Sequence, residues 1–163
     1  MRKFSDTDKQ EKKVLFELLS EFEVDAPIHY RTGKPKRYYP IGKCFVKSCD
    51  YVLDCLERKV SDIVLCHGTY FNPCDKLPEY KYEPENAHAW VEIPGDIVFD
   101  SNLQRFYKKV DYYKIFRITK LYQFTAIEVC EKMAETKSYG EPLGVWKNFE
   151  HWYKKITNRE PLP

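Results

Sequence analysis

A β-hairpin is predicted by the segment Asn86-Ala87-His88-Ala89-Trp90-Val91-Glu92-Ile93-Pro94-Gly95-Asp96-Ile97-Val98-Phe99-Asp100. Residues 87–93 alternate between apolar and polar side chains, as in a half-buried strand, and residues 97–100 are apolar before a final carboxylate. Between them, Pro94 presets one backbone dihedral and Gly95 accepts a positive one, which favours a tight turn. We therefore expect two antiparallel strands with polar groups near their open ends.

Two of those polar groups suggest chemistry. His88 lies near the start of the first strand and Asp100 ends the second, so we expect them to face each other across the hairpin. A histidine held by a carboxylate is the base half of a nucleophilic triad. Strand alternation puts Trp90 on the same face as His88, where it shields the pair, lines a pocket or belongs to the core. Glu92 follows on that face and is expected to be solvated.

The candidate nucleophile is Cys44. The segment Gly42-Lys43-Cys44 opens a helix predicted over residues 42–58, with a buried stripe of Phe45, Cys49, Val52, Leu53 and Leu56. Unpaired N–H groups and the positive end of the helix dipole stabilise an anion in the first turn, which favours a thiolate there. Gly42 allows close approach of a substrate to the backbone.

The other cysteines are interpreted as structural. Cys49, Cys55, Cys66 and Cys130 lie within apolar patterns and are predicted to be small buried residues, and Cys74 in a Pro-containing loop is interpreted likewise. No Cys-x-x-Cys spacing occurs, so neither a zinc site nor another metal is expected. The phosphate-loop and dinucleotide motifs are absent, and no cofactor is predicted.

Further elements follow from periodicity and from Pro and Gly positions. They are a helix over 5–23, a loop over 24–41, a strand over 62–71, a long loop over 72–85, strands over 112–116 and 118–124, a helix from a capping box at Thr125 to about 137, and a helix over 146–156. Tyr39 lies in the first loop, which either lines a cleft or is a solvated connection. His67 is either a site residue or a hydrogen-bonded sheet histidine, and Gly68 marks a bulge or a close approach of another strand.

Composition limits the class of protein. A chain of 163 residues with 43% hydrophobic residues is expected to form one domain over 1–163. A net charge of +2 gives no reason to expect nucleic acid as a partner. No window approaches the roughly 20 apolar residues of a membrane span, and the charged start of the chain does not look like a secretion signal. We therefore expect free thiols and a reducing, cytoplasmic location.

With Gly42-Lys43-Cys44 at a helix start, the run His88-Ala89-Trp90-Val91-Glu92 on a strand and Asp100 ending the next, the chain resembles the transglutaminase-like branch of the papain-like cysteine enzymes. It also resembles small uncharacterised phage and bacterial proteins that carry the same blocks. The resemblance covers residues 42–100 and extends at most to Phe116. It implies an α+β fold in which the nucleophile-bearing helix packs on a small antiparallel sheet, with additional N- and C-terminal helices.

The resemblance also implies roles: Cys44 is the nucleophile, His88 the base, and Asp100 the residue that orients the base. Papain-type enzymes place a Gln shortly before the Cys, and none lies between Glu11 and Cys44. The oxyanion donors would then be the Cys44 backbone N–H, with a Tyr or the Lys43 side chain.

We therefore predict a cysteine-dependent hydrolase or acyltransferase that acts on an amide bond of a protein, a peptide or a small molecule. The residues expected to contact substrate are Gly42, Lys43, Trp90, Tyr39 and His67. The alternative is a catalytically inactive binding protein of the same fold, such as a phage inhibitor of a host protein, in which Cys44 is only a packing residue.

Overall fold

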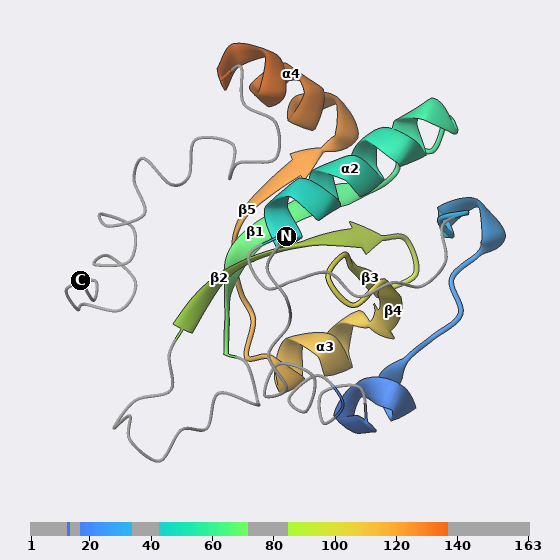
Figure 1. Cartoon of the computed structure of the whole chain (residues 1–163), viewed down its shortest axis with the longest axis vertical. Coiled ribbons are helices and arrows are strands. Elements are labelled where there is room, and N and C mark those ends of the chain that lie inside the picture. Colours follow the sequence, from blue (N-terminus) through green and yellow to red (C-terminus); the bar gives the residue numbers. More distant parts are fainter. Residues whose placement is uncertain (1–12, 14–16, 34–42, 72–84, 137–163) are drawn as a thin grey trace.

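The computed structural model describes residue 13 and residues 17–33, 43–71 and 85–136 of the chain (Figure 1). These residues form an α+β fold built on a five-stranded antiparallel sheet of order β4-β3-β2-β1-β5. The strands are β1 (Val64–Phe71), β2 (Glu85–Ile93), β3 (Ile97–Asp100), β4 (Arg105–Lys108) and β5 (Thr119–Thr125). The helices are α2 (Cys44–Glu57), α3 (Lys109–Ile115) and α4 (Ala126–Thr136), with 3-10 turns at Ser20–Phe22 and Ile28–Tyr30.

The sheet buries both of its faces. On one face, Leu65, Val91 and Phe99 form a core with residues of α2 and α4, which lie side by side in Figure 1. On the other face, Trp90 and Val98 pack with residues of α3 and of the N-terminal segment. Because successive strand residues point to opposite faces, β2 divides its side chains between these two cores.

The predicted hairpin is present, but its register differs from the expected one. Val91 pairs with Phe99 and Ile93 with Ile97 around a turn centred on Gly95, whose φ is 86°. Continued beyond β3, this register puts Asp100 opposite Trp90. The prediction that His88 directly faces Asp100 is therefore wrong. The turn is centred on Gly95, one residue after Pro94, which lies midway in sequence between His88 and Asp100. The two side chains share one face of the sheet and meet diagonally.

Gly68 has the role that its position predicted. The pairing of β1 with β5 shifts between His67 and Gly68, and a Cβ on Gly68 would lie 2.1 Å from the Thr119 carbonyl oxygen. The same Cβ would lie 2.9 Å from the ring of Trp90. Gly68 is also the β1 partner of His88. Only glycine leaves room here for β5 and for the indole that lies beside His88.

The strand predicted over residues 112–116 is wrong, because this segment belongs to α3 and its last turn. Tyr112 and Phe116 are four residues apart and are both buried on the same side of the helical segment, with ring centroids 4.8 Å from each other. Helical spacing of two core aromatics thus outweighs the β-propensity of the individual residues. The predicted capping box is confirmed, since Glu128 Oε2 accepts the Thr125 backbone N–H at 2.7 Å.

The helix over 42–58 and the strands over 62–71 and 118–124 are confirmed by α2, β1 and β5. Of the helix over 5–23, residues 17–19 are helical and a 3-10 turn follows, while the other residues except Lys13 and Glu23 lie outside the described part. Gly42, Tyr39, Cys74, most of the loop over 72–85 and the helix over 146–156 also lie outside it.

Cys49, Cys55 and Cys66 are buried and free, as predicted. Cys130 is free but exposed, so its predicted burial is wrong: α4 turns its neighbour Val129 toward the sheet and Cys130 outward. In the described ranges, no helix is both long enough and apolar enough to cross a membrane.

Candidate active site

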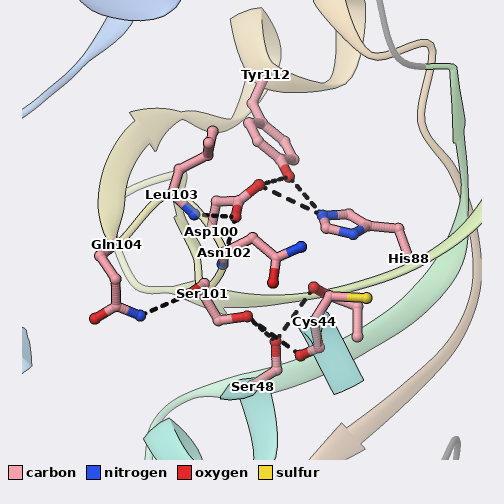
Figure 2. A network of polar contacts seen from close by, with 10 residues as sticks. Cys44, Ser48, His88, Asp100, Ser101, Asn102, Leu103, Gln104 and Tyr112 are labelled. Atoms are coloured by element: carbon pink, nitrogen blue, oxygen red, sulfur yellow. Dashed lines mark hydrogen bonds and ion pairs between the residues drawn. The ribbon is translucent and has the colours of Figure 1, made fainter. Parts of the chain in front are cut away.

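The site lies where β3 ends. β2 runs from Glu85 to Ile93, whereas its pairing with β3 covers only its last residues, so the edge of β2 near His88 has no β3 partner. The N-terminus of α2 comes to this edge, and Cys44 and Phe45 pack on Ala89. The short strand therefore allows a residue of the α2 layer to approach a side chain on the opposite face of the sheet (Figure 2).

Two buried serines, Ser48 and Ser101, link α2 to the sheet at the end of β3 through hydrogen bonds. Ser48 lies one turn after Cys44 and its Oγ donates to the Ala89 carbonyl at 3.2 Å. Ser101 Oγ lies 2.9 Å from Ser48 Oγ and donates to the Cys44 carbonyl at 3.2 Å. These contacts link the first residue after β3, strand β2 and helix α2, and they fix the height of Cys44 relative to the sheet.

Asp100 is buried and both of its carboxylate oxygens are occupied. Oδ1 accepts the backbone N–H groups of Asn102 at 2.8 Å and Leu103 at 2.9 Å. Oδ2 lies 3.4 Å from His88 Nε2 and accepts the Tyr112 hydroxyl at 2.6 Å. Burial alone would raise the pKa of Asp100, but the nearby His88 and the hydrogen bonds from Tyr112 and Leu103 outweigh it and hold that pKa below its ordinary value.

His88 is held on three sides. Its Nε2 lies 3.0 Å from the Tyr112 hydroxyl oxygen, and its ring contacts the rings of Tyr70 and Trp90, with centroids at 4.6 and 6.0 Å. Burial alone would lower the pKa of His88, but the interactions with Asp100 and then with Cys44 raise it above the ordinary histidine value. The site therefore favours an imidazolium over a neutral ring.

Tyr112 is a member of this network that the sequence did not indicate, because its segment was predicted to be a strand. Burial, and then the neighbouring Asp100 carboxylate, raise the pKa of Tyr112 well above its ordinary value. The phenol therefore keeps its proton. α3 places this hydroxyl between Asp100 and His88 (Figure 2).

The predicted residues Cys44, His88 and Asp100 are thus brought together from α2, β2 and β3, and each is 3% exposed. Figure 2 shows the Cys44 sulfur beyond the imidazole from Asp100, with no hydrogen bond drawn between sulfur and ring. Cys44 is one of the groups whose interactions raise the pKa of His88.

The residues predicted to contact substrate are dispersed. Lys43 is exposed at the N-cap of α2, next to Cys44. Trp90 is fully buried in the core beside His88, which agrees with the interpretation of this residue as core.

His67 lies on the α2 face of the sheet and is 1% exposed, with ring contacts to Phe45 and Phe124. Among the residues that the structure describes, neither of its ring nitrogens has a hydrogen-bond partner, so the prediction of a hydrogen-bonded sheet histidine is wrong. Burial, and then the neighbouring His88, lower the pKa of His67 to about 3.

Asn102 also belongs to the site and was missed. Its backbone N–H caps Asp100, and Figure 2 shows its carboxamide extending toward the space between His88 and Cys44. The Oδ1 atom of Asn102 is buried and has no hydrogen-bond partner within the described part of the chain. An Asp followed by Ser-Asn at a strand end is a known signal for a turn in which the carboxylate accepts backbone N–H groups, and this signal could have located the segment.

Glu92 is not solvated, contrary to the prediction. Its carboxylate binds Lys109 at 2.7 Å, Lys120 at 3.3 Å and the hydroxyl of Tyr113. Burial alone would raise the pKa of Glu92, but the hydrogen bonds from Lys109 and Tyr113 lower it to about 2. This cluster joins β2 to α3 and β5 on the face of the sheet that also carries His88.

Within the described part of the chain, no group of three or more His, Cys, Asp or Glu side chains is arranged to hold a metal ion. No protein-family model, curated protein or solved structure matches the chain.

Proposed function

We propose that this protein is a cysteine-dependent hydrolase or acyltransferase of the papain-like, transglutaminase-like type, acting on an amide bond of a protein, a peptide or a small molecule. The observation that carries the proposal is the convergence of Cys44, His88 and Asp100 at the end of β3, from segments far apart in the chain. A thiol, an imidazole and a carboxylate in this order form the set used for nucleophilic acyl transfer.

In the proposed mechanism, His88 takes the proton of the Cys44 thiol, and the thiolate attacks the carbonyl carbon of the amide. The raised pKa of His88 and the lowered pKa of Asp100 support the charged forms that this thiolate–imidazolium pair requires. His88 then gives its proton to the leaving amine as the C–N bond breaks. A thioester on Cys44 remains, and water or a second amine cleaves it with His88 as the base.

The tetrahedral intermediate needs donors for its oxyanion. The first backbone N–H groups of α2 lie in the same helical turn as Cys44 and have no partner within the helix. The carboxamide of Asn102 is the side chain best placed to add a second donor, because it extends toward the gap between thiol and imidazole. It takes the role that a Gln before the Cys has in papain-type enzymes.

A binding protein with the same site is the second candidate, and the 3% exposure of both Cys44 and His88 favours it. In that case Cys44 would be a packing residue and its thiol would react no faster than an ordinary buried one.

The two candidates are separated by alkylation with iodoacetamide at neutral pH, followed residue by residue by mass spectrometry. If the protein is an enzyme, Cys44 should react faster than Cys130. Cys130 is free and exposed, so it serves as a reference in the same molecule. His88→Ala should lower the Cys44 rate at least tenfold without changing the Cys130 rate. His29→Ala, on an exposed 3-10 turn, is the matched control and should change neither.

Acyl transfer is tested in parallel with p-nitrophenyl acetate. A burst of p-nitrophenolate with an acetyl mass on Cys44 supports the enzyme. Slow alkylation of Cys44 that does not depend on His88, together with no acetylation, would refute the proposed activity and leave the binding protein.

A further inference from the structure

We propose that Tyr112 is a positioning residue of this site, and that Asp100 acts on His88 mainly through the Tyr112 hydroxyl rather than by direct contact. The inference rests on the proposed function, in which His88 is the base for Cys44. It turns the expected triad into a chain of four groups, in the order thiol, imidazole, phenol and carboxylate.

The distances support this order. The direct separation between His88 Nε2 and Asp100 Oδ2 is 3.4 Å, beyond the usual range of an N–H···O hydrogen bond. The path through Tyr112 is shorter at both steps: 3.0 Å from Nε2 to the phenol oxygen, and 2.6 Å from that oxygen to Asp100 Oδ2. Both steps lie within the usual ranges for N–H···O and O–H···O hydrogen bonds.

Proton counting then fixes the direction of each bond. The Asp100 carboxylate only accepts, so the single hydroxyl proton of Tyr112 is donated to it. The phenol oxygen can therefore only accept from His88, and Nε2 must carry a hydrogen. With Nε2 occupied, Nδ1 is the ring nitrogen left to exchange a proton with Cys44.

Packing of the Tyr112 ring holds its hydroxyl in the position that these two hydrogen bonds require. The Tyr112 ring contacts the rings of Tyr107 and Phe116, with centroids at 5.7 and 4.8 Å, and is 1% exposed. Its hydroxyl therefore has a fixed place between Asp100 and His88. Moving it would leave a buried carboxylate short of a donor.

A double-mutant cycle tests the inference. Tyr112→Phe keeps the ring and removes only the hydroxyl, and Asp100→Asn keeps an acceptor for the Asn102 and Leu103 N–H groups. If Asp100 acts through Tyr112, each single variant should slow alkylation of Cys44 by a similar factor of about 10 or more, and the double variant should be no slower than the worse single one. Tyr51→Phe is the matched control, because it removes another buried hydroxyl, bonded to the Tyr30 carbonyl at 2.7 Å, without touching His88.

A second measurement reads the contact without using the thiol. In 15N-labelled Cys44→Ala protein, at a pH above the pKa of His88 so that the ring is neutral, NMR of the histidine ring nitrogens should show a hydrogen on Nε2 and none on Nδ1. Adding Tyr112→Phe should shift or broaden the Nε2 proton signal, and adding Tyr51→Phe should not. Circular dichroism and a thermal melt of each variant establish that it is folded.

The outcomes separate the two proposals. If Tyr112→Phe leaves the Nε2 proton signal unchanged, or if the single hydrogen of the neutral ring is on Nδ1 rather than Nε2, the role of Tyr112 is refuted even where Cys44 is activated. If Cys44 shows no activation in the unmodified protein but the NMR signals behave as expected, the proposed function fails and the His88–Tyr112–Asp100 arrangement stands.

Discussion

At the scale of single residues, His67 combines burial with the lack of a partner. Both ring nitrogens are buried and have no hydrogen-bond partner in the described ranges, which costs about 1–3 kcal/mol for a polar group. We therefore expect His67→Leu to leave the free energy of unfolding unchanged or to raise it. A substantial loss of stability would mean that the imidazole makes a contact on which the fold depends.

The effect of His67→Leu on the free energy of unfolding should depend on pH. The pKa of His67 is lowered from 6.5 to about 3, so at pH 5 the unfolded chain binds a proton at this residue and the folded chain does not. Between pH 7 and pH 5 the unmodified protein therefore loses about 2 kcal/mol that His67→Leu does not lose. Urea unfolding of both proteins at the two pH values measures this difference, and an equal gain at both values would contradict it.

At the scale of elements, Glu92 connects β2 to α3 and β5. Because the pKa of Glu92 is lowered from 4.5 to about 2, its stabilising effect is complete above pH 4.5 and is lost as the pH falls toward 2. Glu92→Gln should cost about 1.5–3 kcal/mol at neutral pH, as expected for charge-assisted hydrogen bonds, and the difference from the unmodified protein should shrink below pH 4.5.

Glu135→Gln is the matched control, since it removes the carboxylate of an exposed ion pair with Lys132 on α4. It should cost less than about 0.5 kcal/mol. Denaturant titrations from pH 7 down to pH 3 measure both variants. A Glu92→Gln curve parallel to that of the unmodified protein would contradict the proposed role of the cluster in holding α3 against β2.

The helices and strands also show which parts of the fold could be predicted from the sequence and which could not. The hairpin, α2, β1 and the capping box of α4 follow from local patterns, and local patterns are visible in a sequence. The segment of α3 was predicted wrongly because its tyrosines and phenylalanine favour strands individually, and only the core decides that Tyr112 and Phe116 share one helical side. The register error came from the exact centre of the turn, which depends on the positive φ of Gly95 and Asp96.

The candidate site was predictable only in part for the same reason. Cys44, His88 and Asp100 carry local signals: a helix start, a strand and a strand end. The site also includes Tyr112, Ser48 and Ser101, which reach it through contacts between segments distant in sequence. The local sequence around these residues gives no signal of those contacts.

At the scale of the whole molecule, the His88–Asp100 interaction joins two strands and depends on α3, so it reports on the complete fold. The lowered pKa of Asp100 gives stability that is complete above 3.8 and lost as the pH falls through the folded value. The raised pKa of His88 gives stability that is complete below 6.5 and lost as the pH rises toward its folded value. The two effects overlap between pH 3.8 and 6.5.

Asp100→Asn should therefore destabilise the protein most within that window, by about 3 kcal/mol, and less on either side. Asp54→Asn, in a partly exposed pair with Arg58, is the control and should cost less than about 0.5 kcal/mol throughout. Unfolding free energies from pH 3 to pH 9 check the profile. A penalty that stays constant over this range would show that Asp100 contributes only through its turn hydrogen bonds.

The position of the site residues along the chain has a consequence for biosynthesis. A ribosome releases the helix that carries Cys44 first, then the strand of His88, the end of β3 and, last, the helix of Tyr112. The network spans residues 44–112, and β5, which pairs with β1 to complete the sheet, follows at residues 119–125. The surroundings of Cys44 can therefore close only after the chain has emerged as far as Tyr112, and a product that ends earlier lacks the phenol that lies between His88 and Asp100.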